Sequence, residues 1–273
     1  MRKLILLSLL LCAMSAVKGQ SYSELVEKAM DYTLKDSLAQ AEELYKEALK
    51  LDPKNARNAL LFSNLGTVQK RMGRLDDAIE SYTMALNITP YATAILLNRA
   101  SIYMEKGFRE KAYLDYCNVI DLLPNDKEAR LMRAYIYMYR RQYKEARIDY
   151  NVVVGEDAQN MTARLGLVML DQKEGRFQSA IESLNLLINE NPREAMLLKM
   201  RANIELEQKY PELALMDLEE AARVDTKDAD IWVMIGDIQL ELKNKGKAKE
   251  AYEKAIALGI PRLNLAEQLK NCR

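Results

Sequence analysis

The sequence predicts an all-α protein, an α-solenoid of about seven helix–turn–helix repeats followed by a C-terminal capping helix. Two observations lead to this fold class. Glycine and proline are scarce, with 10 and 6 residues in a chain of 273, whereas Ala, Leu, Glu and Lys are frequent, and this composition favours helices over strands. Alanine also recurs at a fixed interval, as expected for a chain built from one repeated unit.

The recurring alanines mark one helix in each repeat. The first interval is 37 residues and the next five are 34. The series is Ala41, Ala78, Ala112, Ala146, Ala180, Ala214 and Ala248. Large residues follow four positions later, at Tyr45, Tyr82, Tyr116, Tyr150, Leu184, Leu218 and Tyr252. Small or apolar residues follow seven positions later, so the three sites share one helix face. Pro53, Pro90, Pro124 and Pro192 then predict the end of four of these helices.

A second helix is predicted before each alanine. Small or modest residues stand twelve positions earlier, at Ala29, Gly66, Ala100, Ala134, Val168, Ala202 and Gly236. Tyr32, Tyr103 and Tyr137, three positions further on, continue an apolar face. Small residues let two helices approach closely, and Gly73, Gly107 and Gly175 indicate the turns between them. Each repeat is therefore predicted to be a helical hairpin.

The pattern resembles the tetratricopeptide repeat, clearest in "FSNLGTVQKRMGRLDDAIESYTMALNITP" and "LNRASIYMEKGFREKAYLDYCNVIDLLP". The resemblance covers residues 22 to 261 and implies a right-handed superhelix. Departures occur where Ala158 and Thr226 replace the closing proline and where Asp171 and Glu205 replace a tyrosine. The repeats are expected near residues 22–55, 59–92, 93–126, 127–160, 161–194, 195–228 and 229–262, with a capping helix over 263–273 that packs through Leu265, Leu269 and Cys272.

The first nineteen residues have the pattern of a secretory signal. Arg2 and Lys3 precede an apolar stretch that is shorter than the roughly 20 residues of a membrane-spanning helix. We expect cleavage of residues 1–19 to leave Gln20 first, with cleavage after Ala16 as the alternative. A retained anchor or lipid attachment at Cys12 are lesser alternatives. The expected location is a bacterial periplasm or the outer membrane, with secretion a further possibility.

Composition excludes several classes of function. The chain has no histidine, which removes histidine-based nucleophile systems and His-ligated metals. Lys plus Arg equals Asp plus Glu, at 40 each, which argues against nucleic-acid binding. No metal cluster or phosphate-binding loop is evident, so no cofactor is expected. Cys117 and Cys272, about four repeats apart, are predicted to be unpaired, partly buried thiols.

In the family, ligands bind the concave surface lined by the first helix of each repeat. Carried over position by position, the resemblance implies a groove lined by Leu97, Ser101, Met104, Leu131, Tyr135, Met138, Leu165 and Met169. Methionine and tyrosine suit an adaptable peptide site. The alternative is that these side chains pack only between neighbouring helices. Lys199 and Asn203 match part of a carboxylate clamp, but Met234 replaces its next asparagine, and Lys199 is expected to be solvated.

The function that the sequence favours is a non-catalytic scaffold that binds a peptide or partner protein in this groove, in the cell envelope. Nucleic acid is not expected as a partner, and any membrane association is expected to be indirect. Two alternatives stay open: a self-assembling structural module, in which oligomers form through the ends or the convex face, and, more remotely, an unusual histidine-free enzyme.

Overall fold

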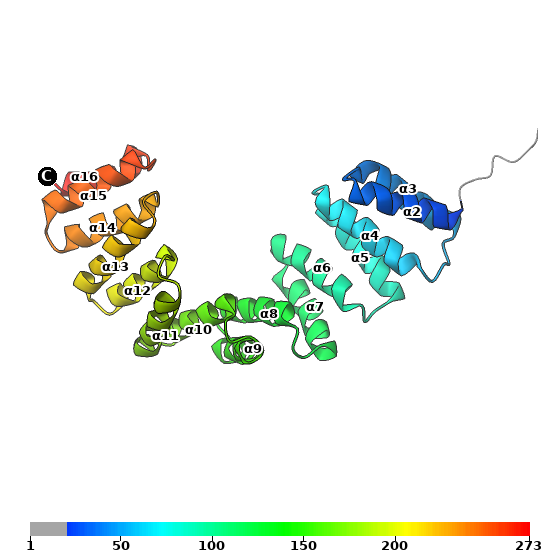
Figure 1. Cartoon of the computed structure of the whole chain (residues 1–273), viewed down its shortest axis with the longest axis horizontal. Coiled ribbons are helices and arrows are strands. Elements are labelled where there is room, and N and C mark those ends of the chain that lie inside the picture. The colour runs from blue at the N-terminus through cyan, green and yellow to red at the C-terminus, as the bar shows by residue number, and fades with distance from the viewer. Residues whose placement is uncertain (1–20) are drawn as a thin grey trace, which may run out of the picture. The chain divides into compact units, whose positions relative to one another are not determined.

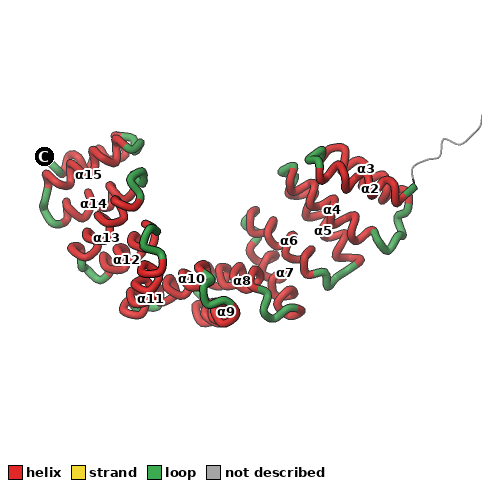
Figure 2. Tube along the Cα trace, in the orientation of Figure 1, coloured by secondary structure: helices red, strands yellow, loops and turns green. Residues whose placement is uncertain are grey.

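The computed structural model describes residues 21–273, all of them in helices or in short turns and loops, so the expected signal segment lies outside the described residues (Figures 1 and 2). Contacts divide the chain into two compact units, residues 21–136 and 137–273. The first unit contains α2 (Tyr22–Leu34), α3 (Leu38–Leu51), α4 (Asn58–Arg71), α5 (Leu75–Ile88), α6 (Thr93–Glu105), α7 (Arg109–Leu122) and most of α8 (Lys127–Tyr139).

The second unit continues the same alternation of two helices and a turn. It contains α9 (Tyr143–Glu156), α10 (Met161–Lys173), α11 (Phe177–Glu190), α12 (Ala195–Glu207), α13 (Pro211–Val224), α14 (Ala229–Glu241), α15 (Lys245–Ala257), the 3₁₀ turn η1 (Arg262–Leu265) and α16 (Ala266–Asn271). The all-helical fold class predicted from the sequence is therefore confirmed for the described residues. No helix among residues 21–273 is long and apolar enough to cross a membrane.

Each hairpin packs internally and against its neighbour within each unit. In the first unit the pairs α2 with α3, α4 with α5 and α6 with α7 form hairpins, and α3 with α4 and α5 with α6 join them. In the second unit α10 with α11, α12 with α13 and α14 with α15 repeat the arrangement, joined through α11 with α12 and α13 with α14. Every joining contact pairs the second helix of one hairpin with the first helix of the next.

The predicted alanine series forms the centre of the packing. All seven alanines are fully buried, and the large residues four positions later are at most 6% exposed. Gly66 and Gly236 show why small residues face them, because a methyl group on either would lie 3.0 Å or less from the ring of Tyr82 or Tyr252. The predicted core faces are therefore confirmed.

The face predicted from the three tyrosines is only partly buried. Tyr103 is 9% exposed and belongs to the core of the first unit, but Tyr32 is 36% exposed. The reason is that α6 lies against the preceding helix α5, whereas among the described residues no helix precedes α2. The apolar face predicted through Tyr32 is therefore left partly exposed at this residue.

The turns inside the hairpins use more than glycine. Gly73, Gly107 and Gly175 adopt φ values of 74–77°, as the sequence predicted. The other four turns place a non-glycine residue in the same left-handed region, at Asp36, Arg141, Lys209 and Lys243, with φ of 58–63°. Packing of the two flanking helices imposes this conformation in every hairpin.

The C-terminal cap is shorter than predicted. Its first turn is 3₁₀ and only Ala266–Asn271 is α-helical. Leu265 is 3% exposed and packs with Tyr252 and Ala255, and Leu269 and Cys272 pack against the same cluster, as predicted. Cys117 and Cys272 are both free and partly buried, which confirms the prediction for the thiols.

Candidate functional site

The residues predicted to bind a partner lie on the first helices of four successive hairpins. They are Leu97, Ser101 and Met104 on α6, Leu131, Tyr135 and Met138 on α8, Leu165 and Met169 on α10, and Lys199 and Asn203 on α12.

These residues divide into packed and accessible side chains. Leu97 and Met104 are partly buried and pack against the core of the first unit, and Leu165 does so in the second unit. Tyr135 is 50% exposed and Met169 is 45% exposed. Asn203 is exposed, and Leu131 and Met138 are half-buried. Helix packing therefore accounts for part of the predicted set and leaves Tyr135 and Met169 available for a ligand.

The polar members of the set are already engaged by the protein. Ser101 Oγ accepts a hydrogen bond from Lys70 Nζ at 2.8 Å and donates one to the carbonyl of Asn98. Lys199 Nζ lies 2.6 Å from Asp228 Oδ2, and both side chains are mostly buried, 26% and 21% exposed. The expectation that Lys199 is solvated is therefore wrong. Asp228 caps the N-terminus of α14, which places its carboxylate within reach of Lys199.

A pocket in the first unit was missed by the sequence analysis. It has a volume of about 160 Å³ and opens between the first helices of the first two hairpins. It is lined by Met30, Thr33 and Leu34 of α2, Tyr45 of α3, and Asn64 and Thr67 of α4. Met30 and Thr67 hold the ninth position of their repeats, the position that Ser101 and Tyr135 hold in theirs. The same register could have identified it, but the groove was assigned only to later repeats.

A second pocket, of about 230 Å³, lies between α12 and α14 in the second unit and extends to the turn between α12 and α13. Its lining combines Leu206, Met234 and Ile238 with Lys209, Pro211, Asp237 and Glu241. Two pairs of consecutive repeats, far apart in the sequence, thus each form a pocket between their first helices. The first is mainly apolar and the second carries two carboxylates and one ammonium group.

The large residue of the second helix bonds to the first helix of its own hairpin in two repeats, and the corresponding Tyr45 lines the apolar pocket. Tyr82 Oη lies 2.9 Å from Thr67 Oγ1, and Tyr252 Oη donates a 2.8 Å hydrogen bond to Asp237 Oδ1. Burial and the neighbouring Asp237 carboxylate raise the pKa of Tyr252, so its phenol stays protonated and keeps donating. These bonds fix the positions of the Thr67 and Asp237 side chains on their first helices.

An arginine at the seventh position of some repeats connects adjacent hairpins, a feature the sequence analysis did not recognise. Arg99 forms a bidentate pair with Asp115, with N···O distances of 2.9 and 2.8 Å, and donates to Thr83 Oγ1 of the preceding hairpin at 3.0 Å. Arg201 makes the equivalent bonds to Asp217 and Asn185. In each case the partners lie sixteen residues before and after the arginine, and this fixed spacing could have revealed the pattern.

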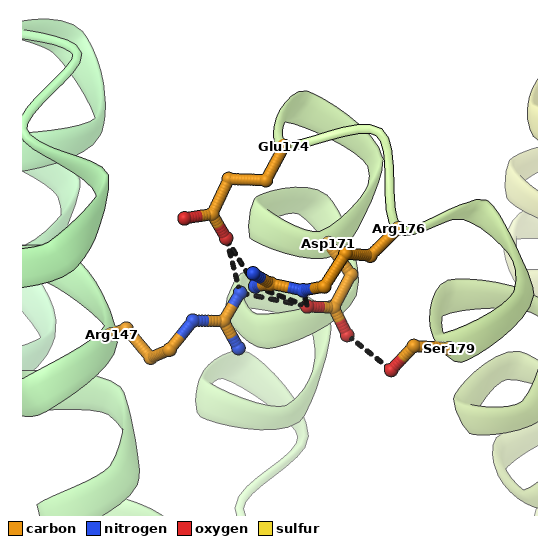
Figure 3. A network of polar contacts seen from close by, with 5 residues as sticks. All are labelled: Arg147, Asp171, Glu174, Arg176 and Ser179. Carbon is orange, nitrogen blue, oxygen red and sulfur yellow. Dashed lines mark hydrogen bonds and ion pairs between the residues drawn. The ribbon is translucent and has the colours of Figure 1, made fainter.

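A denser polar network lies where α9, α10 and α11 meet (Figure 3). Arg147 Nη2 lies 2.7 Å from both Asp171 Oδ1 and Glu174 Oε2, and Arg176 contacts the same two carboxylates. Ser179 Oγ donates to Asp171 Oδ2 at 2.9 Å. Burial opposes ionisation of Asp171, but the donors Arg176, Ser179 and Arg147 outweigh it and lower its pKa. The network connects three helices, and both carboxylate oxygens of Asp171 are bonded within it.

The described residues contain no group of three or more His, Cys, Asp or Glu placed to hold a metal ion. The accessible features of the first helices include these two pockets and the exposed apolar side chains that lie between them in sequence. Such features can bind side chains of another protein by burial and hydrogen bonding.

Comparisons with known proteins agree with the repeat pattern. Models of the tetratricopeptide repeat match residues 23–90 and 229–258. The human protein DnaJ homolog subfamily C member 7 is 43% identical over 76 residues, and its mouse counterpart is 42% identical over 76 residues. That match covers 28% of this chain and only 15% of either relative.

Solved structures match over a longer stretch. A tetratricopeptide repeat protein from Parabacteroides merdae is 34% identical, with a TM-score of 0.70, covering 93% of this chain and 99% of that one. YrrB, described as a TPR protein with an unusual peptide-binding site, has a TM-score of 0.58 at 16% identity over 73% of this chain and 97% of its own. Because the Parabacteroides protein is matched over nearly its whole length at this identity, the chain belongs to the tetratricopeptide repeat family.

Proposed function

We propose that this protein is an exported, non-catalytic scaffold of the cell envelope that binds a segment of a partner protein on the inner side of its first helices. The observation that carries the proposal is a pocket in each unit between two consecutive first helices, with the twelfth position of one repeat and the sixth and ninth positions of the next in both linings. Tyr135 and Met169 add accessible apolar surface on first helices between those repeats.

The size of the pockets favours side chains over small molecules as ligands. Drug-sized ligands occupy pockets of about 300–1,000 Å³, whereas the apolar pocket has about 160 Å³. It suits one apolar side chain, with the Asn64 amide at its edge to hydrogen-bond the backbone of the same segment. The pocket near Asp237 and Glu241 suits a side chain that carries donors.

The proposal contains no cofactor, no nucleic acid and no reaction. Its affinity would come from a few buried apolar anchors, as in most protein interfaces. Met169 and Met30 can adjust their rotamers to different anchors, which permits more than one partner sequence.

The partner can be identified by photo-crosslinking in intact cells that express the full chain. A photoreactive residue replaces Tyr135 or Met169, and matched controls carry it at Leu186 or Leu213, exposed apolar positions on second helices. We expect the first-helix positions to yield a defined crosslinked protein that mass spectrometry identifies. Equal yields of that protein from the second-helix positions would contradict the proposed site.

A direct affinity measurement then uses a synthetic peptide spanning the crosslinked segment. Tyr135→Ala and Met30→Ala should each weaken binding by about tenfold, because truncating a buried anchor costs about 1–2 kcal/mol. Leu213→Ala serves as the control. Unchanged affinity in both first-helix variants, with circular dichroism spectra like the parent, would show that the partner does not bind on the first helices.

A further inference from the structure

The first hairpin presents a helix face that has no covering helix among the described residues. Gln69 and Glu42 show which positions meet across consecutive hairpins. Gln69, at the eleventh position of its repeat, donates a hydrogen bond to Glu42 on the preceding second helix. In the first hairpin the eleventh position is Tyr32, which is 36% exposed although Tyr103 in the third repeat is 9% exposed. The face around Tyr32 therefore has the register of a joint between hairpins, and no helix within residues 21–273 covers it as α5 covers α6.

The charge of this hairpin is acidic. Residues 21–51 carry seven Asp and Glu against four Lys. On α2, Glu27 and Asp31 are exposed and both precede Tyr32, and Glu43 and Glu47 are exposed on α3. Lys28 and Lys35 lie within one helical turn of Tyr32, and Lys35 pairs with Asp31 at 2.7 Å. The first hairpin thus combines the partly exposed Tyr32 ring with a net charge of −3, from seven acidic and four basic residues. We call the exposed side chains of α2 and α3 the head.

The other end of the array is strongly basic. Residues 242–273 carry eight Lys and Arg against three Glu. Lys243, Lys245, Lys247 and Lys249 are all exposed at the turn before α15 and in its first part. Lys245 Nζ donates to the carbonyl oxygen of Arg273 at 2.7 Å, which brings this turn beside the C-terminal end of α16 and its exposed Lys270. One continuous basic surface results, which we call the tail.

The tail also contains an apolar depression. Leu263 is 86% exposed, the highest value, together with Leu34, among the large apolar residues of the described chain. With Ala266 and Leu269 it lines a pocket of about 370 Å³ rimmed by Arg262, Lys270 and Arg273. An apolar centre with a cationic rim complements the head, which has an apolar centre and an anionic excess.

We propose that the tail of one molecule binds the head of a second copy of this chain, with Tyr32 seated near Leu263 and the lysines of the tail against the acidic groups of the head. The contact is heterologous, so it links copies in series. An anionic lipid surface would use the basic tail but would leave the matching head unexplained. The presence of complementary charge and an uncovered apolar side chain at both ends favours a second copy.

The association can be measured by sedimentation velocity on protein purified from cells that express the full chain. We expect the average mass to rise reversibly with concentration at about 50 mM salt and to fall at about 500 mM salt, because exposed charges are screened over a few ångströms at high ionic strength. A mass that stays that of one chain at every concentration in low salt would overturn the proposal.

A charge-swap experiment tests the pairing of the two ends. The tail variant is Lys243→Glu, Lys247→Glu and Lys270→Glu, and the head variant is Glu27→Lys and Asp31→Lys. Each alone should lose association by about tenfold or more, since both of its ends then carry the same sign. Mixing the two variants should restore association, because every head then meets a tail of opposite charge.

Two controls separate this contact from general charge effects. Lys173→Glu with Lys227→Glu changes exposed lysines elsewhere and should leave the mass curve unchanged. Flotation with vesicles of phosphatidylglycerol is run in parallel. If the tail variant loses vesicle binding while the mixture of variants stays monomeric, the tail binds anionic lipid and the second copy is ruled out as its partner. Neither result bears on the first-helix pockets, so the proposed function is tested independently of this contact.

Discussion

Glu205 shows what one residue can do inside a repeat. It is 7% exposed, at the position that tyrosine holds in the third repeat as Tyr103, and its Oε2 has no hydrogen-bond partner among the described residues. Burial, followed by repulsion from Asp217, raises its pKa to about 7, with Arg201 partly offsetting both. The carboxyl group therefore titrates near neutral pH.

The second helix of the preceding hairpin explains why Glu205 has no hydrogen-bond partner for its Oε2, whereas polar residues at the same position of other repeats have partners. Gln69 meets Glu42, and Asp171 meets Arg147, each from the preceding second helix. The corresponding residue before Glu205 is Ile181, which supplies no charge. A buried polar side chain is stable only when its neighbour across the joint is matched to it.

Glu205→Gln should stabilise the protein at high pH. Because the folded-state pKa is raised, the contribution of Glu205 is most favourable below its unfolded pKa and is lost as pH rises through about 7. We expect the variant to gain about 1–2 kcal/mol over the parent at pH 8.5, after allowing for solvent screening, and much less at pH 5.5. Urea unfolding at both pH values measures this. Glu219→Gln is the control, and an equal gain at both pH values would show that ionisation is not the cause.

A second residue-scale prediction concerns Gly236. A methyl group there would lie 2.4 Å from Cε1 of Tyr252, whereas nothing lies within 4 Å of the same group on Gly246. Gly236→Ala should therefore lower the free energy of unfolding by about 1–3 kcal/mol. Gly246→Ala, in a helix with open space, should be neutral or stabilise by up to about 1 kcal/mol. Equal effects in thermal melts of the two variants would contradict the packing described.

At the scale of elements, the joints between hairpins combine apolar ridges with a few buried ion pairs. The Arg99 side chain is 17% exposed and that of Asp115 only 4%, so water solvates neither charge well and each depends on the other as its ion-pair partner. Arg262 and Glu253, by contrast, form a pair whose side chains are 63% and 40% exposed. The first pair joins α6 and α7 and, through Thr83, the preceding α5.

Arg99→Met should destabilise the first unit by about 3–5 kcal/mol, because it leaves the buried Asp115 carboxylate unpaired. Arg262→Met should change the free energy of unfolding far less than Arg99→Met, because both side chains of its ion pair are largely exposed to water. The double variant Arg99→Met with Asp115→Leu should recover most of the loss. Urea unfolding combined with hydrogen exchange on α6 and α7 measures all three, and a double variant as unstable as the single one would show that the arginine acts mainly through Thr83.

At the scale of the whole molecule, both units use the same hairpin and differ in surface. The first unit carries the apolar pocket and the acidic head, and the second carries the mixed pocket and the basic tail. Partner binding on first helices and contact between copies at the ends use separate surfaces, so one does not preclude the other.

Export is the remaining expectation at this scale. Expression of the full chain in a bacterial host followed by fractionation should place it outside the cytoplasm, and the intact mass should correspond to a chain that begins at Gln20. A mass beginning at Val17 would support the alternative cleavage after Ala16. Retention of Met1 would contradict processing by a signal peptidase.

The sequence by itself determined the hairpins and their cores, because alanine, a large residue and a small residue at helical spacing can be buried in only one way. Helices α3, α5, α7 and α11 end two residues before a proline, and α9 and α13 end at the equivalent position without one. Where no proline follows, the packing of the hairpins therefore determines the residue at which the second helix ends.

The tertiary structure decided which surface residues are free. Lys199 and Ser101 look like ligand-binding residues in the sequence, but Asp228 and Lys70, 29 and 31 residues away, occupy them. Tyr32 and Tyr103 look alike and differ in burial because, among residues 21–273, only Tyr103 lies on a helix that follows another hairpin. Helical periodicity reports which face a side chain is on, and only the packing of neighbouring hairpins determines what that face meets.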